Sequence, residues 1–185
     1  MKINVTKLTN VDLARKACQY TLHSHAETKI GLRTLYGAEH SPARTQMFWI
    51  EMQGIPSYVS THFVRHKIGV EHFVKTNRLD RGATTVADRN TPVNHAMLIN
   101  AQAIINISRK RFCSHADEVT REVWKYVKNT IKDIDPDLAE FMVVDCVYRG
   151  KCYEPSSCGL AESFFGKYDC VIPKHPMEGG EEESG

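Results

Sequence analysis

Two short segments in the first half of the chain alternate between apolar and polar positions. Residues 2–8, KINVTKL, and residues 43–54, ARTQMFWIEMQG, change character at nearly every position, which predicts two β-strands. Between them, the apolar positions of residues 11–23 recur at helical spacing and predict an amphipathic helix. A short helix is expected over residues 55–66, because a proline near its start suits a first helical turn, and Arg65 falls near its end.

The second half of the chain has a mostly helical pattern. Residues 79–95 are polar and contain Gly and Pro, which predicts a long loop. Residues 94–134 then follow a helical pattern that divides into two helices, with Ser114 as the expected cap of the second. Another helix is expected to begin at Asp135. Residues 176–185 are acidic and rich in glycine, so we expect them to form a flexible tail.

Composition narrows the class of protein. The chain has 185 residues and is 42% hydrophobic, so we expect one domain over residues 1–175 with a core that needs no disulfides. Its net charge is only +2, so no nucleic-acid partner is expected and any anion site must be local. The N-terminus lacks an apolar leader, and no apolar run reaches the ~20 residues of a bilayer span. These features predict a cytoplasmic protein that does not bind a membrane.

The six cysteines form no CxxC pair, so reduced thiols are expected. Five residues separate Cys146 from Cys152, and five more separate Cys152 from Cys158. Together with Cys170, these thiols present the alternative of a structural zinc site. Zinc sites usually have tighter spacing, so small buried thiols are the favoured interpretation and no metal is expected.

Two clusters of basic side chains carry the candidate chemistry. Residues 63–78, FVRHKIGVEHFVKTNR, interleave apolar residues with six side chains that carry or can carry positive charge. The second cluster lies on a helical stripe formed by Asn100, Ile104, Ile107, Arg111 and His115. Taken alone, Arg111 and His115 are best interpreted as a solvated surface pair. Two such clusters in one chain favour a site for an anion.

Cys113 lies two residues from both Arg111 and His115, which raises the alternative of a cysteine nucleophile activated by histidine. Side chains two positions apart point to different faces of a helix, so this arrangement does not suit a nucleophile and its base. We therefore expect no enzyme nucleophile at Cys113.

In their order and spacing, the two clusters resemble the motifs of the flavin-dependent thymidylate synthases. RHK, eight residues and TNR are similar to that family's Arg-His-Arg, seven or eight residues and Ser-x-Arg. Residues 100–116, NAQAIINISRKRFCSHA, match without a gap the family's Asn-Ala-Arg helix. Residues 39–42, EHSP, resemble the segment leading into the strand before the first motif. The resemblance covers roughly residues 37–135.

This resemblance implies an α+β fold, with an antiparallel sheet packed against helices, and a homotetramer whose active sites are shared between subunits. It implies FAD as the cofactor, NADPH and methylenetetrahydrofolate as co-substrates, and dUMP or a similar pyrimidine nucleotide as the substrate. The implied reaction is the reductive methylation of dUMP to dTMP.

The resemblance also implies roles for individual residues. The expected flavin contacts are Ser41, Arg65, His66, Lys67, Ile68, Asn100, Gln102, Asn106 and His115. The expected nucleotide contacts are His62, Thr76, Asn77, Arg78, Arg89 and Arg111, and three of them, Thr76, Asn77 and Arg78, would form a turn that grips phosphate. Arg111 is also expected to be catalytic, because it would face the uracil carbonyl and stabilise negative charge on the pyrimidine.

The sequence departs from the family pattern at several positions. Lys67 replaces the usual third basic residue, an arginine, and so loses a planar, bidentate contact. Gln102 replaces the arginine of Asn-Ala-Arg, and Glu71 and His72 are the nearest counterparts of an Asn-Glu pair. These departures leave two alternatives: a related modification of a pyrimidine deoxynucleotide, such as hydroxymethylation, and a catalytically inactive protein that binds flavin or nucleotide.

Overall fold

The computed structural model describes residues 1–21, 28–75, 79–82 and 88–165. Their strands form a four-stranded antiparallel sheet in the order β1-β2-β4-β3, made of β1 (Lys2–Lys7), β2 (Met47–Pro56), β3 (Val70–Val74) and β4 (Pro92–Asn100). The helices are α1 (Val11–Gln19), α2 (Leu32–Gly37), α3 (Ser57–Val64), α4 (Ala101–Arg111), α5 (Glu118–Ile134), α6 (Pro136–Phe141), α7 (Asp145–Arg149) and α8 (Leu160–Phe165). Short 3-10 helices span Ser41–Thr45 and Leu79–Arg81.

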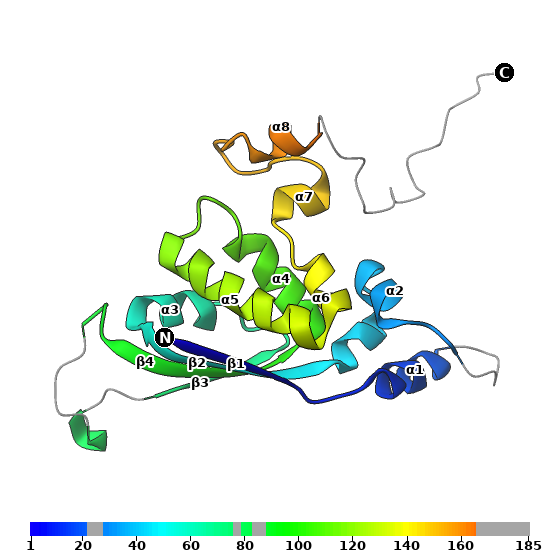
Figure 1. Cartoon of the computed structure of the whole chain (residues 1–185), viewed down its shortest axis with the longest axis horizontal. Coiled ribbons are helices and arrows are strands. Elements are labelled where there is room, and N and C mark those ends of the chain that lie inside the picture. The colour runs from blue at the N-terminus through cyan, green and yellow to red at the C-terminus, as the bar shows by residue number, and fades with distance from the viewer. Residues whose placement is uncertain (22–27, 76–78, 83–87, 166–185) are drawn as a thin grey trace.

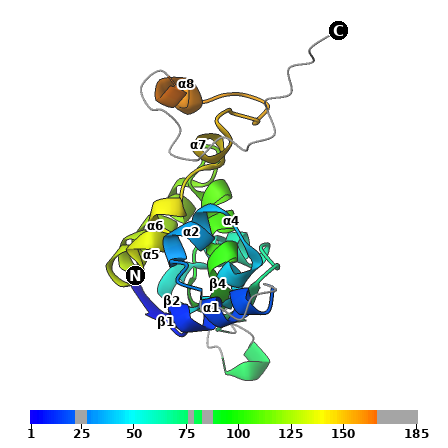
Figure 2. The same cartoon turned by 90° about the vertical axis from the view of Figure 1, so that its right-hand side faces the viewer.

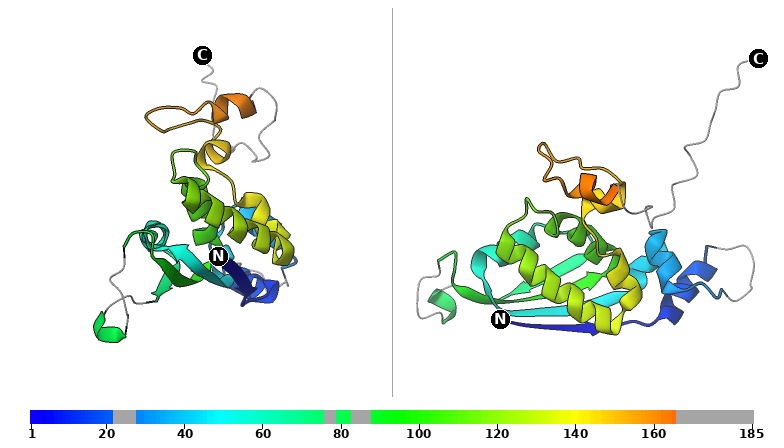
Figure 3. Two further views of the ribbon diagram at one scale, coloured as in Figure 1. Left: turned by 60° about the vertical axis from the view of Figure 1, so that its left-hand side comes forward. Right: turned by 45° about the horizontal axis from the view of Figure 1, so that its top comes forward.

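Helices α3, α4, α5 and α6 cover one face of the sheet (Figure 1). Figure 3 shows α5 running along the length of the strands. Figure 2 shows α7 and α8 stacked beyond this helix layer, on the side away from the sheet. No helix in the described ranges is both long and apolar enough to cross a bilayer.

The core lies between the sheet and the covering helices. Alternate residues of β2 point into it, and Phe48, Ile50 and Met52 are fully buried. The largest buried side chain is Trp124 of α5, whose Nε1 donates to Ser108 Oγ at 2.9 Å. Because this hydrogen bond satisfies the indole's only donor, Trp124 can be buried between α5 and α4 without leaving a polar group unpaired.

The main departure from the sequence predictions is β4. A loop to residue 95 and a helix from residue 94 were predicted, and both boundaries are wrong, because residues 92–100 form a central strand paired with β2 and β3. Its buried residues alternate along the strand as Val93, His95, Met97 and Ile99. Half-buried Ala96 and Leu98 lie between them, so the apolar run hid the alternation.

Other boundaries also differ in detail. The first helix ends at Gln19, before the predicted residue 23. Asp117, and not Ser114, caps α5, since its Oδ1 accepts the Thr120 amide at 2.8 Å. Asp135 caps α6 at the predicted position, through the Leu138 amide. The expected tail, residues 176–185, lies outside the described residues.

Candidate functional site

The two basic clusters meet where α3 and α4 end. Arg111 is the last residue of α4, and its Nε donates to His66 Nε2 at 3.0 Å. Its Nη2 donates to the carbonyl oxygen of His62 at 2.6 Å. The fold therefore brings together three residues assigned to the site from two separate motifs.

His66 is a neutral acceptor in this arrangement. Because Arg111 donates to Nε2, the ring proton of neutral His66 must lie on Nδ1. Burial, followed by the nearby Arg111 and His72, lowers the pKa of His66 to about 4. Burial, with Arg65 as the second cause, also lowers the pKa of Arg111. Near neutral pH the guanidinium remains the charged member of the pair.

His62 is held by a second set of contacts. Thr120 donates its hydroxyl proton to Asp117 Oδ1, so His62 Nδ1, 2.8 Å from Thr120 Oγ1, must be the donor in that bond. Tyr58 packs edge-on against His62, with ring centroids 5.7 Å apart. The guanidinium of Arg89 lies over the Tyr58 ring, 4.9 Å from its centroid. These contacts place Arg89 on the same side of α3 as His62.

The turn after α3 exposes cationic and apolar side chains together. Arg65, Lys67 and Ile68 are exposed, and 88% of Ile68 is open to solvent. Gly69 closes the turn at φ 75°, and its carbonyl accepts the Asn100 amide at 3.0 Å. A Cβ at position 69 would lie 2.4 Å from Asn100 Nδ2, so only glycine fits against the start of α4.

Asn100, one of the expected flavin contacts, also has a structural role. Its side-chain oxygen accepts the Ala103 amide at 2.9 Å and so caps α4. We call Asn100, Ile104, Ile107 and Arg111 the Arg111 stripe. It begins at this cap and ends at Arg111, which donates to His66.

A different set of polar residues lies on the other side of α4. We call Gln102, Asn106 and Arg109 the Arg109 stripe; at ~100° per residue, Gln102 and Arg111 point in opposite directions. Gln102 Nε2 donates to Glu39 Oε2 at 2.5 Å, and Arg109 forms an ion pair with the same carboxylate. The Arg109 guanidinium also stacks 3.4 Å from the centroid of the Tyr148 ring. The structure therefore does not bring Gln102 and Asn106 to Arg111 within one chain.

The remaining expected site residues are dispersed. Ser41 is exposed at the start of the first 3-10 helix. His115 lies beyond the end of α4, with Nε2 2.9 Å from the Ser156 carbonyl oxygen. The three residues of the expected phosphate turn, Thr76, Asn77 and Arg78, lie outside the described residues.

The cysteines gather in another part of the molecule. A cavity of about 20 Å³ between the end of α4 and the α7–α8 segment is lined by residues that include Cys113, Cys146, Cys152 and Cys158. These thiols are unpaired, and burial, followed by Cys152, raises the pKa of Cys146. Across the described residues, no group of three or more His, Cys, Asp or Glu side chains is placed to hold a metal ion. Cys170, the fourth member of the zinc alternative, lies outside those residues.

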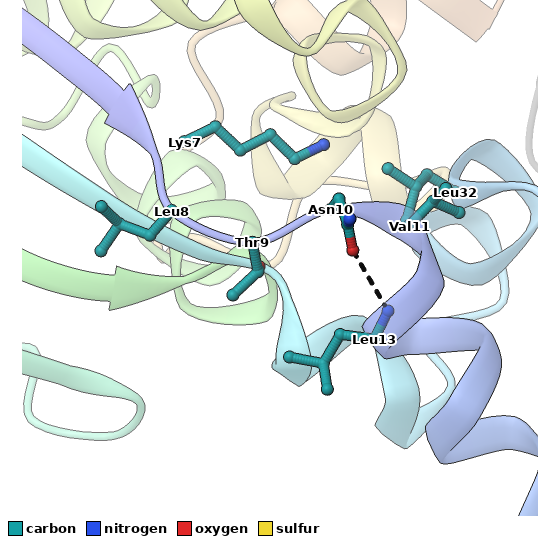
Figure 4. Close-up of a pocket in the computed structure, with 7 residues that line it drawn as sticks. All are labelled: Lys7, Leu8, Thr9, Asn10, Val11, Leu13 and Leu32. Carbon is teal, nitrogen blue, oxygen red and sulfur yellow. Dashed lines mark hydrogen bonds between the residues drawn. The ribbon is translucent and has the colours of Figure 1, made fainter.

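A hollow of about 680 Å³ lies where β1 leads into α1 (Figure 4). Its lining is Lys7, Leu8, Thr9, Asn10, Val11, Leu13 and Leu32. The polar groups there already have structural partners: Asn10 Oδ1 accepts the Leu13 amide, and Lys7 pairs with Asp135 at 2.7 Å. Asn10 and Lys7 are therefore engaged in holding the fold, and we assign no binding or catalytic role to this hollow.

Sequence reasoning did not single out two polar residues behind the site, Ser60 and His95. Both are buried, and they lie in a hydrogen-bonded chain that reaches His72. The alternation of residues 93–99 contained the signal that would have placed His95 on a buried strand face. The helical interpretation of that segment concealed it.

No family model and no curated protein matches this sequence. Solved structures do match. Thymidylate synthase X (ThyX) from Helicobacter pylori, crystallised with FAD and dUMP, is 14% identical with a TM-score of 0.61, and the match covers 77% of this chain and 99% of that one. A second crystal structure of this enzyme with FAD and dUMP gives 13% identity, a TM-score of 0.61, and coverage of 77% and 100%.

A UMP/dUMP methylase, PolB from Streptomyces cacaoi, bound with 5-Br dUMP, is 15% identical with a TM-score of 0.58. This match covers 76% of the present chain and 94% of PolB. Identities this low show the arrangement of the backbone and leave the chemistry to be argued from the site. The likeness confirms the predicted α+β architecture: the chain has the fold of the flavin-dependent thymidylate synthases.

Proposed function

We propose that this protein is a flavin-dependent enzyme that modifies C5 of a pyrimidine deoxynucleotide, and that its reaction is the reductive methylation of dUMP to dTMP. FAD would be the cofactor, with methylenetetrahydrofolate as carbon donor and NADPH as reductant. The observation that supports this most is the hydrogen bond between Arg111 and His66, which joins two motifs at one place. The similar structures from H. pylori contain FAD and dUMP on the same fold.

The exposed turn of residues 65–69 has the chemistry to hold a flavin. Arg65 and Lys67 supply cationic donors for a diphosphate, and exposed Ile68 supplies an apolar surface for a ring system. When bound, FAD would supply the hydride that completes the methyl group. The protein's own contribution would be orientation and the placement of charge.

Arg111 would act on the nucleotide base. Its guanidinium is fixed by the neutral ring of His66 and by the carbonyl of His62, and both acceptors leave its positive charge uncompensated. A fixed cation beside a uracil carbonyl stabilises the negative charge that develops as C5 becomes nucleophilic. Arg89, stacked on Tyr58, would face the phosphate side of the nucleotide.

The first test of this proposal is flavin binding. Arg65→Ala and His66→Ala should each lose bound FAD, because both residues belong to the turn that would hold it. The control is Arg33→Ala, which removes an exposed arginine paired with Glu140 on another part of the surface. Absorbance at flavin wavelengths per mole of folded protein gives the result. Full flavin retention by both turn variants would show that this motif does not bind the cofactor.

The second test identifies the reaction. Protein that carries flavin should lose its yellow colour with NADPH, and mass spectrometry of the products from dUMP, UMP and dCMP should find a methyl group on dUMP. A hydroxymethyl product would show a related modification. Reduction without any product would favour a binding protein, an outcome consistent with the engagement of Gln102 by Glu39.

The proposed enzyme is a homotetramer with shared sites. In one chain, the Arg111 stripe and the Arg109 stripe point in opposite directions, so a single flavin cannot contact both sets of expected residues on the same subunit. Contributions from neighbouring subunits would resolve this. The mass in solution, measured by light scattering with FAD and dUMP present, should be four times that of the chain. A persistent monomer would contradict the shared site.

A further inference from the structure

A chain of hydrogen bonds runs from the core of the protein to the turn of residues 65–69. Ser60 Oγ lies 3.0 Å from His95 Nδ1, and His95 Nε2 lies 3.0 Å from His72 Nδ1. His72 Nε2 lies 2.7 Å from the carbonyl oxygen of His66. His95 is only 1% exposed, so this chain is anchored in the interior.

The direction of this chain follows from its last member. A carbonyl oxygen can only accept, so His72 must carry a proton on Nε2. When the His72 ring is neutral, its Nδ1 is an acceptor, and His95 must donate from Nε2. The Nδ1 of neutral His95 then accepts the hydroxyl proton of Ser60. Each donor in the chain has one acceptor, and one tautomer is specified at each histidine.

We propose that His72 is the positioning residue for the turn that contacts the flavin. Ser60 and His95 fix the tautomer of His72 in which Nε2 donates to the His66 carbonyl. This inference rests on the proposed function for the identity of the ligand. The orientation of His66 is thereby held at two points: its backbone by His72 and its ring by Arg111. A turn that is already held in position loses little conformational entropy when its ligand binds.

Two substitutions at position 72 separate the two ends of the ring. In His72→Gln the amide nitrogen reaches about as far as the lost Nε2, so the donor to the His66 carbonyl is kept. In His72→Asn the shorter side chain replaces Nδ1, which keeps an acceptor for His95 but releases the carbonyl. The variants are matched in chemistry, and each shortens the hydrogen-bond chain by one link.

The first measurement is FAD affinity by titration of purified full-length protein. His72→Asn should weaken FAD binding roughly three- to tenfold, the equivalent of one net hydrogen bond. His72→Gln should stay within about twofold of the parent. Equal weakening in both variants would show that His72 only fills space, and unchanged affinity in both would show that the turn does not depend on it. Either result overturns the proposal.

The second measurement needs no ligand. Amide hydrogen exchange over residues 65–69 should be faster in His72→Asn than in His72→Gln, and nitrogen NMR of the parent should find His72 and His95 protonated on Nε2. If the parent binds no FAD, the proposed function fails. Faster exchange in His72→Asn than in His72→Gln would still show that the hydrogen bond from His72 holds the turn in place. An Nδ1-protonated His72, or equal exchange in the two variants, would overturn it.

Discussion

The two polar stripes of helix α4 place their arginines in opposite electrostatic settings. Arg109 is paired with the Glu39 carboxylate and stacked on Tyr148. Arg111 donates to a neutral ring and a backbone carbonyl, and it takes part in none of the ion pairs found among the described residues. One stripe is neutralised within the chain, and the other keeps its charge.

The two sides of α4 therefore differ in what their charges can do: the Arg109 stripe stabilises the fold, and the Arg111 stripe has a charge available to a ligand. Glu39 and Arg109 are largely buried, with 22% and 14% of their side chains exposed, so breaking their pair would leave a poorly solvated charge. The cation of Arg111 is fixed in direction but not compensated, which is the arrangement that stabilises charge arising on a ligand. Two arginines two positions apart therefore have different predicted consequences on removal.

The largest expected effect tests the Arg111 stripe. Arg111→Ala should lower turnover of dUMP by roughly 10² to 10³, because it would remove the charge-assisted hydrogen bond that we propose Arg111 makes to the base. Single-turnover kinetics of the flavin-loaded protein measure this effect. Cys113→Ala should cost little, since Cys113 lies in the cysteine-lined cavity. Near-normal product from Arg111→Ala with complete loss in Cys113→Ala, and a 5-fluoro-dUMP adduct on Cys113, would replace this mechanism with a cysteine nucleophile.

The next prediction concerns acid stability near the Arg111 stripe. Burial, followed by neighbouring charges, lowers the pKa of both His66 and His95 to about 4. Between about pH 6.5 and pH 4 the unfolded chain therefore binds protons that the folded protein does not. The free energy of unfolding should fall as pH decreases through this window, by on the order of 2–3 kcal/mol for buried His95.

Urea unfolding at a series of pH values measures this dependence. His95→Gln cannot titrate at this position, so it should make the slope between pH 6.5 and pH 4 shallower and leave the part that comes from His66. An equally steep slope in the variant would show that His95 is not the source of the acid sensitivity.

The Arg109 stripe should respond to acid in a different window. Burial alone would raise the pKa of Glu39, but hydrogen bonds from Tyr148 and Arg109 outweigh it and lower the pKa. A carboxyl with a lowered pKa stabilises the fold above its unfolded pKa, and that contribution is lost as pH falls through the folded value. Glu39→Gln should therefore cost about 1–3 kcal/mol of unfolding free energy at pH 7 and progressively less below about pH 4.5.

Chemical denaturation at pH 7 and pH 3.5 distinguishes the parent from Glu39→Gln. A loss of stability of the same size at both values would show that the Glu39 charge is not what holds this side of α4. A drop in turnover as large as that of Arg111→Ala, with stability unchanged, would abolish the distinction between the two stripes.

Much of the fold could be predicted, because several elements carry a clear local signal. Strands β1 and β2 alternate between apolar and polar residues, and α3 and the cap at Asp135 are marked by residues that suit the start of a helix. β4 was missed because Ala96 and Leu98 are apolar on its second face, and a strand with two apolar faces has no period of two. β3 is a short edge strand with mostly exposed residues, so its pattern is weak.

The site was predictable as two separate motifs but not as one arrangement. Spacing on a helix placed Arg111 on one stripe, and the RHK motif placed His66 after α3, yet their hydrogen bond depends on how α3 and α4 pack. The ion pair of Glu39 with Arg109 could not be predicted either, because the partners are 70 positions apart in the sequence. Long-range contacts of this kind require the tertiary structure.

The contact between Gly69 and Asn100 has a consequence for how this sequence can change over time. A larger residue at position 69 would collide with the amide of Asn100, and a residue without a short polar side chain at position 100 would remove the cap of α4. Because Gly69 also lies at φ 75°, a smaller residue at position 100 would not by itself make a larger residue at position 69 tolerable. Among homologous sequences, we expect glycine to persist at 69, and position 100 to change only to other residues that cap helices.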